Sequence, residues 1–178
     1  GTIGLEILEQ LPDVDVVVVP IGGGGLIAGV AYTIKQINPN CKVYGVQAAG
    51  APSMKNSVAD GKIETLKNVQ TIADGIAVKT PGTNTFELIK KYVDGIYTVS
   101  DDEIALAILT LMEQQKLVSE GAGAVPVAAV MNGKIPDIEG KKVCCLVSGG
   151  NIDVTILSRV IERGLKMGGR SAYITIAL

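Results

Sequence analysis

The sequence contains no histidine among its 178 residues. This absence excludes a Ser-His-Asp or Cys-His catalytic constellation and any metal site that needs an imidazole ligand. It also removes the side chain most often used for proton transfer at neutral pH. Aromatic residues are nearly missing too, with no tryptophan, one phenylalanine and five tyrosines. The core must therefore be built from Val, Ile, Leu and Ala, and any chemistry must use other groups or a cofactor.

Charge and long apolar runs are also scarce. Sixteen basic residues against eighteen acidic ones leave a formal charge of -2, with no basic cluster that could neutralise a run of phosphates. We therefore expect no nucleic-acid partner. No apolar run approaches the roughly 18 residues that cross a membrane, and residues 1–6 have neither the basic start nor the apolar stretch of a signal peptide. We expect a cytoplasmic protein with no membrane partner.

The three cysteines, Cys41, Cys144 and Cys145, show no CxxC pair or other metal-ligand spacing. Cys144 and Cys145 are adjacent in an apolar run, where their side chains would point to opposite faces of a strand. The sequence thus predicts buried free thiols in a reducing compartment.

Short runs rich in β-branched residues alternate along the chain with segments of helical spacing. Strands are predicted at residues 14–21, 42–48, 95–100 and 142–148, and helices at residues 3–11, 26–37, 85–93, 101–117, 122–132 and 153–167. This alternation predicts an α/β fold, a parallel twisted sheet with helices on both faces. The first and last strand runs are almost continuously apolar, so we expect both to be buried on both faces.

Three segments carry further structural signals. Ser100 followed by Glu103 predicts a capping box at the start of the helix over 101–117. Residues 52–83 are less regular and predict one helix followed by a long excursion, and excursions of this length are often functional. Residues 172–177 alternate in the manner of a strand.

Four consecutive glycines, Gly22, Gly23, Gly24 and Gly25, separate the first predicted strand from a helix that begins at Leu26. Such a loop exposes consecutive backbone N–H groups at the positive end of a helix dipole, which makes it an anion site. A plain strand-to-helix turn would carry a large entropic cost for four glycines in a row. We therefore predict a phosphate-binding loop.

Three kinds of phosphate ligand compete for this loop. A nucleotide P-loop needs Gly-Lys-Ser/Thr at the helix start, and here Gly29 is followed by valine and alanine. A dinucleotide fingerprint can be written as Gly23-x-Gly25-x-x-Ala28, but residues 46–49 do not supply the acidic residue expected after the second strand, so NAD is the weaker option. The third interpretation is a cofactor that carries a single phosphate.

A second glycine turn, Ser148-Gly149-Gly150, follows the last predicted strand. Because the carboxyl ends of parallel strands meet at one edge of a sheet, the two turns could converge on one ligand. Ser148 is the only side chain at that strand end that can donate a hydrogen bond. A simple helix-capping or turn serine is the alternative interpretation.

Four motifs, in order, resemble the second half of the threonine dehydratases (threonine ammonia-lyases). These are pyridoxal-phosphate enzymes of the tryptophan-synthase-β type, called fold type II. The resemblance runs from Gly1 to about Arg170, and it assigns residues 1–168 to the C-terminal part of the cofactor-binding catalytic domain. Residues 169–178 resemble a linker and the truncated start of an ACT-like regulatory segment. The motifs are residues 19–26, 73–82, 119–124, and 148–151 with 157–165.

The resemblance implies a role for each matched position. The amides of residues 22–26 would hold the phosphate of pyridoxal 5'-phosphate, Ser148 would hydrogen-bond the pyridine nitrogen, and Gly75 would lie beside the reactive edge of the cofactor. Glu120 and the carbonyl of Ala124 match positions that in relatives hold a monovalent or divalent cation.

The cation assignment has an alternative. A hard cation needs further oxygen ligands, and the position two beyond Ala124, acidic in some relatives, is Pro126 here. Alternatively, Glu120 would hydrogen-bond backbone amides at the start of the following helix.

One departure from the family pattern concerns the catalytic group. In the family the cofactor forms a Schiff base with a lysine in a Ser-x-Lys-x-Arg-Gly-type motif of the N-terminal half, and a Ser/Asn-rich loop of that half holds the substrate carboxylate. None of the thirteen lysines lies in such a context, including Lys35 and Lys79, the nearest to the predicted ligand turns. We therefore expect no catalytic residue in this chain, and we expect the missing N-terminal half as its partner.

The resemblance thus implies part of an enzyme that converts threonine or serine to a 2-oxo acid and ammonia by β-elimination. It further implies a homo-oligomer when intact, in threonine catabolism or isoleucine biosynthesis. The chain alone should be inactive. Two alternatives remain open, an NAD-binding Rossmann-type dehydrogenase domain and a non-catalytic truncated fragment.

Overall fold

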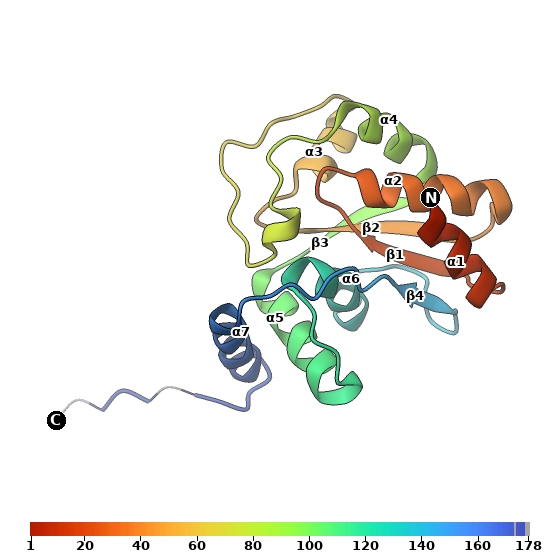
Figure 1. Cartoon of the computed structure of the whole chain (residues 1–178). Coiled ribbons are helices and arrows are strands. Elements are labelled where there is room, and N and C mark those ends of the chain that lie inside the picture. Colours follow the sequence, from red (N-terminus) through yellow and green to blue (C-terminus); the bar gives the residue numbers. More distant parts are fainter. Residues whose placement is uncertain (173, 177–178) are drawn as a thin grey trace.

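A four-stranded parallel sheet forms the centre of the protein (Figure 1). The structure is a computed structural model that describes residues 1–172 and 174–176. The strands are β1 (Val16–Pro20), β2 (Lys42–Ala48), β3 (Gly95–Val99) and β4 (Val143–Cys145), in the spatial order β3-β2-β1-β4. Each neighbouring pair is parallel, which confirms the predicted α/β class.

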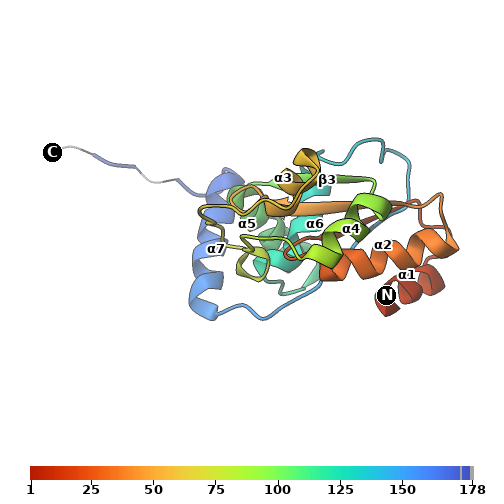
Figure 2. The ribbon, with the colours of Figure 1, turned by 90° about the horizontal axis from the view of Figure 1, so that it is seen from above.

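Helices cover both faces of this sheet, as Figures 1 and 2 show. All six predicted helices form, the single helix predicted within residues 52–83 also forms, and a 3₁₀ turn is added to that region. One face is covered by α1 (Thr2–Gln10), α2 (Gly25–Ile37), α3 (Ser53–Asp60) and α4 (Thr83–Tyr92). The opposite face is covered by α5 (Asp101–Thr110), the π-helical turn η2 (Leu111–Gln115), α6 (Gly121–Met131) and α7 (Val154–Met167), while the 3₁₀ turn η1 (Asp74–Ile76) lies within the excursion.

Alternation along β1 explains its burial. Val17 and Val19 pack with the α2 side of the sheet, and Val16 and Val18 pack with the α5 and α6 side. Every residue of β1 is buried, as predicted, because helices cover both faces of the sheet and β1 lies between two neighbouring strands, β2 and β4.

The last strand departs from its prediction. β4 ends at Cys145 instead of Ser148, with one further ladder bond in which the amide of Leu146 donates to Val18 (3.0 Å). Its residues are half-buried, so the expectation of burial on both faces was wrong. The physical reason is position, since β4 pairs only with β1 and forms an edge of the sheet.

The cysteines follow the predicted pattern in part. Cys144 and Cys145 pack in the cores on opposite faces of the sheet, although both are half-buried, and Cys41 is buried. All three are free thiols. Burial raises the pKa of Cys145 to about 12 and that of Cys41 to about 11, so neither thiol forms a reactive thiolate at neutral pH.

The local signals at α5 and after α7 are confirmed in part. The capping box is present, because Ser100 Oγ accepts from the Glu103 amide at 3.2 Å and the Glu103 carboxylate accepts from the Ser100 amide at 2.7 Å. The helix predicted to residue 117 instead passes into η2, and Lys116 ends it at φ 58°. The strand predicted over 172–177 lies partly outside the described residues, and residues 174–176 form no regular element.

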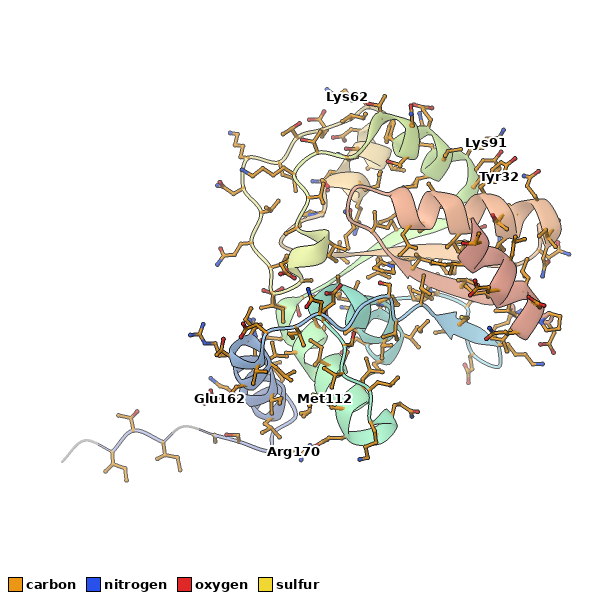
Figure 3. All side chains as sticks on the ribbon, in the orientation of Figure 1. Tyr32, Lys62, Lys91, Met112, Glu162 and Arg170 are labelled. Atoms are coloured by element: carbon orange, nitrogen blue, oxygen red, sulfur yellow. The ribbon has the colours of Figure 1, made fainter. Side chains whose placement is uncertain are left out.

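The surface carries the long polar side chains. Figure 3 shows Lys62, Lys91 and Glu162 pointing outward from the fold, with Arg170 beyond the end of α7. Arg170 pairs with Glu113 of η2 at 2.7 Å, so the segment after α7 begins folded against the domain. Within the described residues, no helix is both long enough and apolar enough to cross a bilayer.

An ion cluster around Asp94 fixes the start of β3 against α2 and β2. Its carboxylate accepts from Lys35 (2.7 Å), Lys42 (2.9 Å) and the amide of Val43 (2.8 Å). Partial burial acts to raise the pKa of Asp94, but the bonds from Lys35, Val43 and Lys42 outweigh it, and the pKa lies below its ordinary value.

An Asp94→Asn variant is therefore expected to lose about 2 kcal/mol of stability at neutral pH, because a charge-assisted network loses its anion. The lowered pKa means that this stabilisation is complete above the unfolded-state value near 3.8 and disappears as pH falls through the folded-state pKa. Urea denaturation at neutral and strongly acidic pH measures the difference. An equal gap between variant and parent at both pH values would contradict the assignment.

Candidate functional site

A hollow of about 230 Å³ opens at the carboxyl edge of the sheet. It lies between the loop that follows β1, the excursion and the segment that follows β4. All seven residues predicted to hold a cofactor line it together, and four further residues complete the wall. The lining consists of Pro20, Gly22, Gly23, Gly24, Gly25, Leu26, Gly75, Ile76, Glu120, Ala122 and Ser148.

Glycine is required at Gly24 by backbone geometry. Its φ is +95°, in the left-handed region, and an added Cβ would lie 2.7 Å from Met54 Cε and 2.8 Å from Ile89 Cδ1. At Gly23 and Gly25, by contrast, an added Cβ would meet nothing within 4 Å. The loop is therefore tightly packed beneath and open on the side of the hollow.

The loop is also tied to the start of α4. The carbonyl of Gly23 accepts hydrogen bonds from the amide of Gly82 (3.2 Å) and from Thr85 Oγ1 (2.6 Å). No side chain caps the amino terminus of α2 at Gly24. The first amides of α2 are thus free to bind an anion, in a loop whose Gly23 carbonyl is already bonded to the start of α4.

The excursion contributes the facing wall through η1. An added Cβ at Gly22 would lie 3.3 Å from Ile76 Cα and 3.4 Å from the Gly75 carbonyl oxygen, so the two segments are in close contact. The Gly75 amide donates to Asp74 Oδ1 at 2.9 Å. The long irregular segment therefore belongs to the site, as its length suggested.

Ser148 lies at the edge of the hollow with an exposed side chain. It does not cap the following helix, because Asp153 is the N-cap of α7 and accepts from the Thr155 amide at 2.7 Å. The turn after Ser148 is held by the Gly149 carbonyl, which accepts from the Glu120 amide (3.0 Å) and from Ser119 Oγ (3.2 Å). The helix-capping interpretation of Ser148 is therefore wrong.

The two residues that the family resemblance suggested for a cation both lie at the start of α6. Glu120 lines the hollow and Ala124 does not. Ala124 lies one turn inside α6, and its amide donates to the Glu120 carbonyl at 3.1 Å. Across the described residues, no group of three or more Cys, Asp or Glu side chains could hold a metal ion. Glu120 makes no side-chain bond to the amides of α6, so the alternative interpretation is wrong, while the cation assignment stays a prediction.

No lysine of the described residues lines the hollow, and the position of the catalytic lysine stays a prediction. Glu120 was placed near the active site only through the family resemblance, as a cation ligand. Its position directly before a helix start was the available signal, but only the fold shows that Gly149 and Gly75 flank it.

In this parallel α/β sheet, a glycine loop joins the first strand to the amino terminus of a helix. This arrangement is typical of domains that bind a phosphate-bearing ligand at the carboxyl edge of the sheet. Comparison with known families makes the class specific. The chain belongs to the pyridoxal-phosphate dependent enzymes, whose family model matches residues 1–149. The NAD-binding alternative is left without support.

The relatives agree with this membership. The chain is 59% identical to an L-threonine ammonia-lyase of Thermotoga maritima over 98% of its own length and 43% of the relative's. It is 53% identical to one of Geobacter sulfurreducens over its whole length and 44% of the relative's. The chain thus spans less than half the length of these two curated relatives.

Solved structures show the same fold. A threonine deaminase from Solanum lycopersicum superposes with a TM-score of 0.83 at 40% identity, over 91% of this chain and 48% of that one. A serine racemase from maize also gives 0.83, at 36% identity, over 94% of this chain and 52% of that one. The fold is therefore that of fold type II pyridoxal-phosphate enzymes.

Proposed function

We propose that the intact protein is a pyridoxal-phosphate-dependent threonine or serine ammonia-lyase, and that this chain forms the part that holds the cofactor phosphate and ring nitrogen. The observation that carries the proposal is the convergence of backbone amides after β1 and a hydroxyl after β4 on one hollow. The relatives named L-threonine ammonia-lyase, at 53% and 59% identity, support the reaction.

The residues present fit the cofactor. The open space at Gly23 and Gly25 leaves room for a phosphate against the first amides of α2. When bound, pyridoxal phosphate supplies an electron sink for the pair left on the substrate Cα. Ser148 hydrogen-bonds the ring nitrogen, and a neutral hydroxyl does not hold a proton there, which moderates the sink and favours β-elimination. The backbone at Gly75 borders the reactive edge.

The other half of the intact protein supplies the Schiff-base lysine and the site for the substrate carboxylate. The exposed edge of β4 supports this division, because its half-buried residues lack the cover that β1 has on both sides. Leu117 and Val118, in the loop before α6, are about half exposed at 49% and 52% and add further exposed apolar side chains. The three free thiols fit a reducing cytoplasm, and we expect the intact protein to be a homo-oligomer.

A chimaera tests the division of labour. We define it as the first half of the Thermotoga maritima relative joined upstream of Gly1. The chain alone, given pyridoxal phosphate and threonine, is expected to yield no 2-oxobutyrate, whereas the chimaera is expected to yield 2-oxobutyrate from threonine and pyruvate from serine. A colorimetric 2-oxo acid assay measures both. Turnover by the chain alone would contradict the proposed division of roles between the two halves. A folded, cofactor-loaded chimaera without turnover would favour the non-catalytic alternative.

A further inference from the structure

A threonine hydroxyl of α4 reaches the glycine loop from the side away from the hollow. Thr85 lies 62 positions after Gly23 in the sequence, yet its Oγ1 donates to the Gly23 carbonyl at 2.6 Å. The two residues meet because α4 lies alongside α2, as both views of the ribbon show (Figures 1 and 2). Thr85 is half-buried at this contact and does not line the hollow.

The same hydroxyl has a second acceptor within its own helix. Thr85 Oγ1 lies 2.9 Å from the carbonyl of Gly82, the N-cap of α4. A hydroxyl carries one proton, and the shorter of the two distances is the one to Gly23. An added Cβ at Gly82 would lie 2.8 Å from Thr85 Oγ1 and 3.4 Å from the Gly23 carbonyl oxygen. The missing side chain at Gly82 thus leaves the space in which Thr85 reaches the loop.

The direction of the Gly23 carbonyl decides the direction of the next amide. The peptide bond between Gly23 and Gly24 is trans, so this carbonyl and the Gly24 N–H point in opposite directions. The carbonyl points to the start of α4, and neither α3 nor α4 contributes a residue to the lining of the hollow. The Gly24 amide therefore points toward the hollow, and no hydrogen bond among the described residues uses it.

A peptide unit between two glycines rotates easily, because neither residue has a Cβ that restricts its backbone. Rotation of this unit would turn the Gly23 carbonyl oxygen into the hollow, where it would repel a phosphate, and would withdraw the Gly24 amide. The bonds from Thr85 and from the Gly82 amide (3.2 Å) oppose this rotation. One hydrogen bond of ordinary strength biases such an equilibrium by up to about tenfold.

On these grounds, and resting on the proposed function, we propose that Thr85 is a positioning residue for the cofactor phosphate. Its hydroxyl holds the Gly23 carbonyl toward α4, which keeps the Gly24 amide facing the phosphate. Thr85 acts through the backbone of the loop and does not touch the cofactor, because it lies outside the hollow. Its contribution is therefore confined to ligands that carry the phosphate group.

The test compares two ligands of the cofactor-free chimaera, pyridoxal phosphate and pyridoxal, which lacks the phosphate. Thr85→Val keeps the branched shape of the side chain but removes the hydroxyl. It is expected to weaken pyridoxal-phosphate binding about tenfold and to leave pyridoxal binding unchanged. Absorbance titrations give both affinities, and their ratio should fall about tenfold. Thr85→Ser retains the hydroxyl and should restore most of the parental ratio.

The matched control is Thr83→Val, the same replacement at the first residue of α4. The Thr83 side chain is exposed and makes no hydrogen bond among the described residues, so the ratio should stay parental. If Thr85→Val folds poorly, Gly82→Ala provides a second variant. Its φ of -71° suits an alanine, and its Cβ would press between the Thr85 hydroxyl and the Gly23 carbonyl. It should lower the same ratio.

Three results would contradict the proposal in different ways. A parental ratio in folded Thr85→Val would overturn the role of Thr85. Equal weakening of both ligands would also overturn it, because it would show that the hydroxyl only stabilises the fold. A parent chimaera that binds pyridoxal phosphate no more tightly than pyridoxal would instead refute the phosphate site of the proposed function, and this inference with it.

Discussion

Replacing Gly24 by alanine is expected to weaken pyridoxal-phosphate binding by about 30-fold to 5,000-fold. Gly24 has φ +95°, which costs an L-residue about 1–2 kcal/mol. The new Cβ would also press on the buried ends of Met54 and Ile89, and overpacking of this kind costs about 1–3 kcal/mol. Relief of both requires the loop to move, and the amides at the start of α2 then lose their alignment on the phosphate. Titration of the chimaera with cofactor, followed by absorbance, measures the loss.

The matched control is Gly23→Ala, one residue earlier in the same loop. Its Cβ would meet nothing within 4 Å, and its φ lies outside the left-handed region. The cofactor-free Gly23→Ala protein should therefore melt at the parental temperature, whereas Gly24→Ala should melt lower. Parental cofactor affinity in Gly24→Ala would show that this loop does not hold the phosphate.

The site could be predicted from the sequence because its parts come from strand ends. A glycine loop after β1 and a Ser-Gly-Gly turn after β4 must meet at one edge once the strands are parallel. The family resemblance assigned their ligands. Helix and strand spacing was equally local information, and it located every strand and all the long helices.

The failures involve contacts between distant segments. The exposure of β4 depends on which strand lies beyond it, and its own apolar run carries no such information. The direction of the Glu120 side chain is decided by Gly149, which lies on a turn that follows a different strand. The family resemblance matched Glu120 with the Ala124 carbonyl, and the fold adds that Glu120 lines the hollow.

Backbone hydrogen bonds hold the irregular excursion in place beside the site. The amide of Leu66 donates to the Lys79 carbonyl (3.0 Å), and the amide of Gln70 donates to the Gly50 carbonyl (3.1 Å). Gly50 lies in the turn after β2, which ends at Ala48. This second bond therefore connects the excursion to the sheet. The placement of Gly75 in the hollow therefore depends on the close approach at Gly50.

Gly50→Ala is accordingly expected to release the excursion. An added Cβ would collide with the backbone carbonyl group of Gln70, and a backbone group cannot rotate away as a side-chain end can. A cost of about 3 kcal/mol, at the upper end for overpacking, corresponds to roughly a 100-fold larger open population. Limited trypsin digestion should then cleave after the exposed Lys67 about 100-fold faster, since cleavage follows the open population when reclosing is fast.

Gly61→Ala is the control for Gly50→Ala, because it lies at the start of the same excursion in open space. Its φ of +73° costs an alanine about 1–2 kcal/mol, but its Cβ meets no atom within 4 Å and leaves the bond between Gln70 and Gly50 intact. Gly50→Ala should also weaken cofactor binding in the chimaera, since a released excursion takes Gly75 out of the hollow. Faster cleavage combined with parental cofactor affinity would show that the excursion does not contribute to cofactor binding.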